Sequence, residues 1–145
     1  APDIAKHFTW VHSVSRIKIA QLLNDSRPAN APPLKICLQV NLDHEPNKAG
    51  VFPEDVETLA RMVLELPNLY LSGLMLIPKQ ETDLTKQYQS FLRLKNLLNQ
   101  LNQTLGTKMQ TLSMGMSHDY LAAIRAGSTI IRIGTALFGE RKGNL

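Results

Sequence analysis

The chain has 145 residues, and its 16 lysine and arginine residues against 12 aspartate and glutamate residues give a formal net charge of +4. A hydrophobic content of 43% and a charged content of 19% are ordinary for a globular chain, which excludes a disordered or fibrous protein. No apolar run approaches the ~20 residues that a membrane-spanning helix needs, and the scattered basic residues form no nucleic-acid-binding motif. We therefore expect one globular domain over residues 1–145, with no membrane or nucleic-acid partner.

The single cysteine, Cys37, bears on the compartment. It excludes an intrachain disulfide framework and a multi-cysteine zinc site. The absence of a disulfide framework fits a reducing compartment, and the first residues lack the charged and apolar regions of a signal peptide. We therefore expect a cytoplasmic location.

Short apolar runs alternate with longer helical patterns along the chain. In chain order, the expected elements are a strand at 9–14, a helix from 15 or 16 to about 23, a strand at 34–41, a helix at 53–66, a strand at 69–77, a helix at 83–101, a strand at 110–113, a helix at 118–126, a strand at 130–133 and a helical turn at 135–138. Ser15 is a candidate N-cap, Pro53 suits a first helical turn, and the prolines at 27–33 predict a loop. The strands are apolar on both faces, so this alternation predicts an α/β fold with a helix-covered parallel sheet.

The last predicted strand carries an arginine among aliphatic residues. Burying an unpaired guanidinium is costly, so Arg132 needs a partner. Gly134 and Thr135 follow at the start of a helical turn, where backbone N–H groups, a close backbone approach and a hydroxyl would hold an anion. The alternative is a buried arginine–carboxylate pair followed by a tight turn, and this junction alone favours neither interpretation.

The preceding junction also joins a strand to a helix through a glycine and hydroxyl groups. Its hydroxyls belong to Ser113 and Ser117, and Ser117 taken alone is a good N-cap for the helix. Two adjacent junctions of this kind, however, are typical of the phosphate site that a barrel builds from the loops after its last two strands. If these are the last two strands of a barrel, we expect a ligand that carries a phosphate.

Other polar or reactive residues carry weaker signals. Gln39 and Asn41 share a strand face, where they would line a pocket or bond the next strand. Met75 is more typical of core packing, Lys48 of a solvated loop, and Cys37 of an inert buried position. The histidines show no metal-ligand spacing, and no catalytic triad or paired-carboxylate arrangement follows from the spacing.

The motifs occur together in one known family. They are WVHSVSRIKIA at 10–20, QVN at 39–41 with KAG at 48–50, GLM at 73–75, LSMGMS at 112–117 and RIGTALFG at 132–139. In this order the chain resembles the YggS family of pyridoxal-phosphate-binding proteins, which are similar to the barrel domain of alanine racemase. The resemblance covers about residues 10–139 and implies a role in intracellular pyridoxal 5′-phosphate (PLP) homeostasis rather than a defined reaction.

The resemblance also implies roles for individual residues. Ser117, Gly134 and Thr135 would hold the cofactor phosphate with Ser113 nearby, and Arg132 would face the pyridine nitrogen. Because arginine is a permanent donor, that nitrogen would stay unprotonated and the cofactor would be a poor electron sink. We therefore expect a non-catalytic PLP carrier, with no catalytic and no metal-ligating residue.

One feature of the family has no counterpart in the sequence. Family members link the cofactor through a Schiff-base lysine at the end of the first barrel strand, and no matching segment occurs here. We therefore expect the C-terminal five strands or so of a TIM (β/α)8 barrel of the alanine racemase N-terminal type, incomplete in this chain and truncated before that lysine. Exposed sheet edges would then favour pairing with another copy of the chain, as self-association, or with the missing N-terminal portion. The alternatives are a PLP-dependent racemase-like enzyme inactive only through truncation, and a complete open five-stranded binding module.

Overall fold

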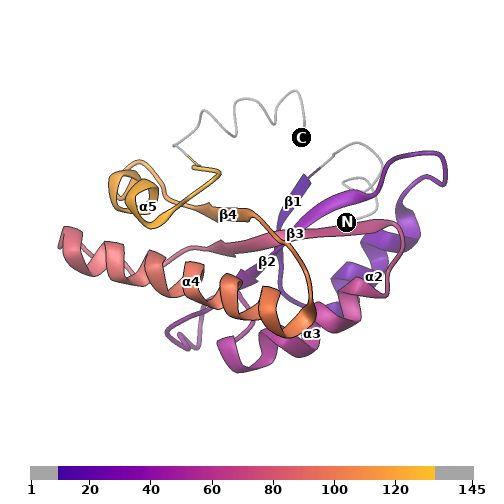
Figure 1. The fold of residues 1–145 in the computed structure, drawn as a ribbon, viewed down its shortest axis with the longest axis horizontal. Coiled ribbons are helices and arrows are strands. Elements are labelled where there is room, and N and C mark those ends of the chain that lie inside the picture. Colours follow the sequence, from indigo (N-terminus) through magenta and orange to yellow (C-terminus); the bar gives the residue numbers. More distant parts are fainter. Residues whose placement is uncertain (1–9, 133–145) are drawn as a thin grey trace.

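The computed structural model describes residues 10–132, and Figure 1 shows their arrangement around a single sheet. In chain order its elements are β1 (Trp10–Val14), α2 (Ile17–Ser26), β2 (Leu34–Val40), the 3-10 helix η1 (Pro53–Asp55), α3 (Val56–Leu64), β3 (Leu69–Leu76), α4 (Leu84–Leu105), β4 (Thr111–Met114) and α5 (Tyr120–Ala126). The strands lie in the order β1-β2-β3-β4, and every neighbouring pair is parallel, which confirms the predicted α/β fold. None of the helices described has the length and hydropathy to span a membrane.

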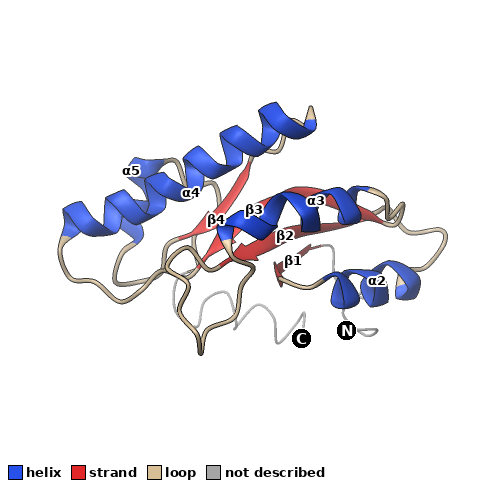
Figure 2. Ribbon diagram, turned by 90° about the horizontal axis from the view of Figure 1, so that it is seen from below, coloured by secondary structure: helices blue, strands red, loops and turns tan. Residues whose placement is uncertain are grey.

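Helices α2, α3 and α4 cover one face of the sheet. Parallel strands that neighbour one another in sequence order need crossovers of the same right-handed sense, which places the connecting helices on one side. Figure 2 shows α3 and α4 lying across the strands when the molecule is seen from below. Strand residues such as Ile36, Leu38 and Leu74 are fully buried on this side, and Phe91 and Leu94 of α4 complete the same hydrophobic core.

The opposite face of the sheet is mixed in chemistry and concave. The β2–β3–β4 register places Gln39, Met75 and Ser113 in one row on this face. His12 of β1 lies 2.7 Å from Ser113 (Nδ1 to Oγ), although β1 and β4 are the outer strands of the sheet. In a flat sheet three spacings of about 4.8 Å would separate them. The sheet therefore curls strongly toward this face, as the wall of a barrel does.

The helix starts match the sequence signals to different degrees. Ser15 is not the N-cap of α2, because the N-cap position belongs to Arg16, which has extended backbone geometry and makes no side-chain capping bond. Pro53 begins the 3-10 turn that leads into α3, as its restricted φ predicts. Asp83, predicted at the start of the longest helix, is the N-cap of α4 and accepts a hydrogen bond from the Thr85 backbone N–H at 2.8 Å.

The fifth predicted strand, at 130–133, is present only as backbone contacts along the free side of β4. Ile130 forms an isolated parallel bridge with Ser113, and the Arg132 N–H donates to the Gly115 carbonyl at 2.9 Å. These contacts continue the parallel order, so residues 130–132 lie beside β4 without forming an assigned strand. The predicted turn at 135–138 lies outside the described residues.

Candidate functional site

The arginine of the last junction is buried at the carboxyl ends of β3 and β4. Arg132 is 8% exposed. Its Nη1 donates to Ser113 Oγ at 2.6 Å and its Nη2 donates to the Leu76 carbonyl at 3.0 Å. The prediction that Arg132 needs partners is confirmed, and both partners are uncharged. An arginine–carboxylate pair, the alternative interpretation, finds no support among residues 10–132, because Arg132 forms no ion pair there.

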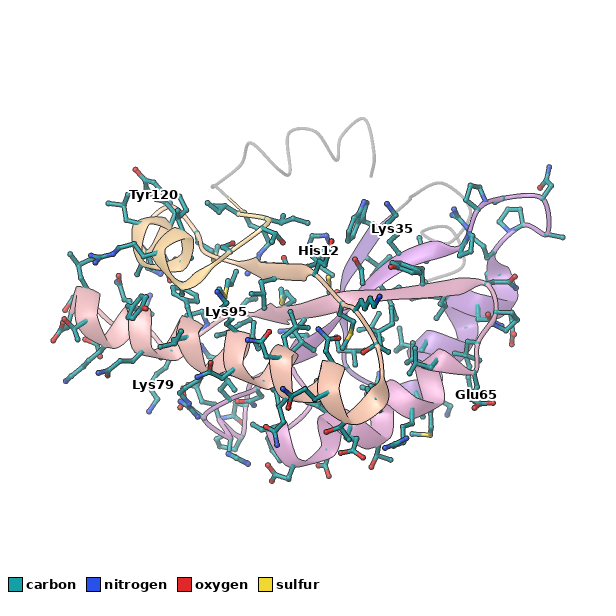
Figure 3. All side chains as sticks on the ribbon, in the orientation of Figure 1. His12, Lys35, Glu65, Lys79, Lys95 and Tyr120 are labelled. Atoms are coloured by element: carbon teal, nitrogen blue, oxygen red, sulfur yellow. The ribbon has the colours of Figure 1, made fainter. Side chains whose placement is uncertain are left out.

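His12 joins this pair from β1. Its Nδ1 lies 2.7 Å from Ser113 Oγ, and its ring meets the Trp10 ring edge-on with the centroids 5.5 Å apart. Figure 3 labels His12 above the sheet. Burial, and then the nearby Arg132 guanidinium, lower the pKa of His12 below its ordinary value, so the imidazole is neutral at neutral pH. Sequence reasoning missed His12 as a site residue, since strand alternation assigns it a face but cannot identify a partner on β4.

Within residues 10–132, the His12–Ser113–Arg132 cluster holds a permanent positive charge that forms no bond to an anionic side chain. Desolvation lowers the pKa of Arg132, and the carboxylate of Asp119 opposes that shift, but a guanidinium stays charged in proteins. Burial raises the pKa of the Cys37 thiol to about 12, so it stays protonated, and its predicted burial is confirmed. In the described part of the chain, no group of three or more His, Cys, Asp or Glu side chains suits a metal ion.

The turn after β4 is shaped by a glycine and a buried carboxylate. Gly115 has a φ of +106°, and a Cβ at this position would lie 2.8 Å from the Ala123 Cβ, so the turn requires glycine. Asp119 Oδ1 accepts from the Met116 backbone N–H at 2.7 Å and holds the turn. Helix α5 begins only after this turn, with Asp119 at its N-cap position. Ser117 therefore lies exposed within the turn, and the prediction that Ser117 is the helix N-cap is wrong.

Five residues were predicted to bind the cofactor. Ser113 and Arg132 are in direct contact in the cluster. Ser117 lies on the neighbouring turn and, among residues 10–132, makes no hydrogen bond with either of them. Gly134 and Thr135 lie outside the described residues. The structure therefore brings Ser113, which was expected near the cofactor phosphate, into contact with Arg132, which was expected at the pyridine nitrogen.

The loop after β2 is held by one buried amide. Asn41 Nδ2 donates to the Glu45 carbonyl at 2.9 Å and to the Lys48 carbonyl at 3.4 Å, while Oδ1 accepts from the Glu45 N–H at 3.0 Å. The Asn41 side chain therefore stabilises the loop rather than lining a pocket or bonding the next strand. Lys48 is exposed, as expected for a solvated loop lysine, and Gln39 and Met75 are buried in the row with Ser113.

Comparison with known proteins agrees with this geometry. The family described as "Alanine racemase, N-terminal domain" matches residues 1–142. A "Pyridoxal phosphate homeostasis protein" of Pseudomonas aeruginosa is 56% identical over 138 residues, which are 95% of this chain and 58% of the relative. A protein with the same description from Vibrio cholerae is 51% identical over the same shares. The chain thus spans less than two thirds of the length of these relatives.

Solved structures show the same fold. PipY of Synechococcus elongatus PCC7942, in its structure without PLP, superposes with a TM-score of 0.84 at 33% identity, covering 95% of this chain and 65% of PipY. The structure of PipY with PLP bound gives a TM-score of 0.83 at 32% identity, covering 95% of this chain and 64% of PipY. The chain therefore belongs to the alanine racemase N-terminal domain family and, within it, to the YggS family.

Proposed function

We propose that this chain forms the part of a (β/α)8 barrel that holds the pyridine ring and the phosphate of PLP, in the service of PLP homeostasis. The observation that carries the proposal is the buried Arg132 guanidinium, held by uncharged partners at the carboxyl ends of a curled parallel sheet. Ligands of parallel α/β barrels bind at that end of the strands. Relatives described as PLP homeostasis proteins and the PLP-bound structure of PipY support the assignment.

The donor chemistry of the cluster fits a pyridine ring. A pyridine nitrogen with a free lone pair accepts a hydrogen bond, and arginine carries five N–H donors and no acceptor. Within the described part of the chain, two of these donors are engaged, by Ser113 and Leu76, which leaves others for a ligand. A buried cation whose hydrogen-bond partners are both neutral also favours a ligand that is anionic or rich in acceptors.

The same residues favour a carrier over a racemase-like enzyme. Bound PLP supplies an electron sink, and protonation of its ring nitrogen strengthens that sink. Arg132 keeps its protons and therefore leaves the ring nitrogen unprotonated. Cys37 is held as a neutral thiol and His12 as a neutral imidazole. The cluster is thus suited to binding and orienting a ring rather than to moving protons.

The phosphate is assigned to the turn after β4 and to the junction that follows Arg132. Ser117 is exposed on this turn, and the backbone N–H groups of Ser117 and His118 donate to no acceptor within residues 10–132. Gly134 and Thr135 would form the other half of the phosphate site, outside the described residues. Ser113 is assigned to the ring side instead, because its hydroxyl contacts both Arg132 and His12.

The architecture and location are part of the same proposal. The curl of β1–β4 supports a barrel wall within a single domain of 1–145, and β1 is an outer strand of the described sheet. Outer strands pair readily with further strands, so we propose self-association of the chain through them. A buried free cysteine fits a reducing, cytoplasmic location.

Titration of the 145-residue chain with PLP, followed by the absorbance of the cofactor, tests the proposed function. We expect saturable binding, and binding at least about tenfold weaker for pyridoxal, which lacks the charge-assisted hydrogen bonds of the phosphate. Arg132→Gln should weaken PLP binding by about tenfold or more. The matched control is Arg61→Gln, because Arg61 forms only an exposed pair with Glu57 on α3.

Three outcomes would contradict this proposal. Equal binding of PLP and pyridoxal would exclude the phosphate site, and equal binding by the wild type and Arg132→Gln would exclude the ring contact. The absence of any PLP binding by the wild-type chain would exclude both. Racemisation of an amino acid by the PLP-loaded chain would favour the racemase-like alternative over the carrier.

A further inference from the structure

The hydrogen bonds of the His12–Ser113–Arg132 cluster have a direction that the chemistry of arginine imposes. Arg132 can only donate, so Ser113 Oγ is the acceptor in their 2.6 Å contact. The hydroxyl hydrogen of Ser113 then remains to be placed. Ser113 is fully buried, and within residues 10–132 the other partner of its hydroxyl is His12 Nδ1 at 2.7 Å. The hydroxyl therefore donates to His12, because no other acceptor among the described residues bonds it.

This direction determines the tautomer of His12. An Nδ1 that accepts from Ser113 carries no hydrogen, so the neutral ring bears its hydrogen on Nε2. The opposite arrangement, with an Nδ1–H donating to Ser113, would leave the buried hydroxyl hydrogen without an acceptor, which is costly. A charged imidazolium would in addition face the Arg132 guanidinium across a single hydroxyl oxygen.

We propose that His12 is a positioning residue for Arg132: it accepts the Ser113 hydroxyl, so that Ser113 Oγ and the Leu76 carbonyl together fix the plane of the guanidinium that faces the ligand. The assignment of that ligand as the PLP ring rests on the proposed function; the orientation of Arg132 does not. Two acceptors on two different amino groups leave a planar guanidinium little freedom to rotate. Without His12 as acceptor, the Ser113 hydroxyl is free to turn and its lone pairs no longer point reliably at Arg132.

Because His12 lies on β1, the hydrogen bonds that orient Arg132 depend on the curl of the sheet. His12 and Ser113 meet across the concave face from the two outer strands. The imidazole is itself held by the edge-on contact with Trp10, over which Lys35 Nζ lies 5.1 Å from the ring centroid. The orientation of Arg132 is therefore coupled to β1, the strand farthest from it in the described sheet.

Two substitutions at His12 separate positioning from bulk packing. His12→Asn keeps an acceptor oxygen near the place of Nδ1, whereas His12→Leu keeps an apolar side chain and removes the acceptor. The matched control is His44→Asn, because His44 is exposed, pairs with Glu54, and has a positive φ that asparagine tolerates. Ser113→Ala breaks the same chain of hydrogen bonds from its centre and serves as the second variant if His12→Leu folds poorly.

Nitrogen-15 NMR of the cofactor-free chain gives the first test. We expect His12 to be neutral with its hydrogen on Nε2, and the Arg132 side-chain Nε–H to give a sharp resonance in the wild type, in His12→Asn and in His44→Asn. In His12→Leu and Ser113→Ala that resonance should broaden or disappear. An Nδ1–H tautomer, an imidazolium, or an Arg132 resonance unchanged in both disrupting variants would overturn the proposal.

The spectrum of added PLP gives the second test. We expect His12→Leu to weaken PLP binding by about tenfold, because one hydrogen bond to a charged group is lost, and to shift the absorbance of the bound cofactor. His12→Asn should remain close to the wild type in both. Tight binding and an unchanged spectrum in His12→Leu would overturn the role of His12 toward the ring. If the wild type binds no PLP, the proposed function fails, while the NMR experiment still decides whether His12 positions Arg132.

Discussion

The two faces of the sheet are stabilised by different kinds of interaction. On the helix side, side chains such as Leu38, Leu74 and Phe91 are fully buried among other apolar residues. On the concave side, the buried residues near the strand ends include a charged arginine, a neutral histidine and a serine that joins them. Apolar packing is additive over many contacts and has no direction, whereas the cluster depends on a few bonds whose donors and acceptors must all be present.

This difference suggests a division of labour within one sheet. The helix side contributes most of the free energy of folding, because it removes most of the apolar surface from water. The concave side holds a desolvated guanidinium, which contributes little net stability but a fixed orientation. Substitutions on the helix side should therefore mainly lower the free energy of unfolding. Substitutions on the concave side should lower ligand affinity more than they lower the free energy of unfolding.

The largest loss of stability is expected for Phe91→Ala on the helix side. Phe91 is fully buried in α4, and removal of such a side chain leaves a cavity, so we expect the free energy of unfolding in urea to fall by about 3–5 kcal/mol. Leu84→Ala at the 63% exposed start of the same helix should change it by less than about 0.5 kcal/mol. Phe91→Ala that remains as stable as the wild type would refute the assignment of the core to this face.

An intermediate loss is expected for Ser113→Ala on the concave side. The substitution removes the partner of both Arg132 Nη1 and His12 Nδ1, and we expect it to cost about 1–3 kcal/mol. Ser72→Ala is the matched control, because Ser72 is also buried but its partner among residues 10–132 is the neutral Thr111 hydroxyl at 2.7 Å, so its cost should be nearer about 1 kcal/mol. An equal cost for both serines in urea unfolding would show that the charge on Arg132 adds nothing.

The two faces also differ in how far the sequence predicts them. Apolar periodicity locates α4 and the residues it buries, including Phe91, because burial of a helix face follows a local repeat. The aliphatic setting of Arg132 likewise predicts that it needs a partner. The contact between His12 and Ser113 joins positions 101 residues apart and depends on the curl of the sheet, which no local pattern encodes. The failed cap at Ser117 has a different, local cause: the buried Asp119 carboxylate, three residues after Met116, accepts its backbone N–H, and Asp119 takes the N-cap position of α5.

The smallest expected effect is a pH dependence that arises from His12. Because the pKa of His12 is lowered in the folded chain, the unfolded chain binds a proton more readily once the pH falls below about 6.5, the ordinary value for histidine. The unfolded state then carries more protons than the folded state, so the free energy of unfolding rises with pH in this window and falls as the pH is lowered. One proton gives a slope of at most about 1.4 kcal/mol per pH unit.

The comparison of wild type with His12→Asn isolates this effect. Of the groups near His12, the Arg132 guanidinium stays charged and the Cys37 thiol stays neutral between pH 5 and 7, and the two proteins differ only at residue 12. Urea unfolding at pH 7 and at pH 5 should therefore show a larger loss of stability for the wild type than for His12→Asn. Parallel losses would mean that His12 takes up a proton as readily in the folded chain as in the unfolded chain. That result would contradict a neutral histidine that is buried beside a desolvated guanidinium. The sign of that difference therefore decides whether the concave face is organised around a neutral histidine.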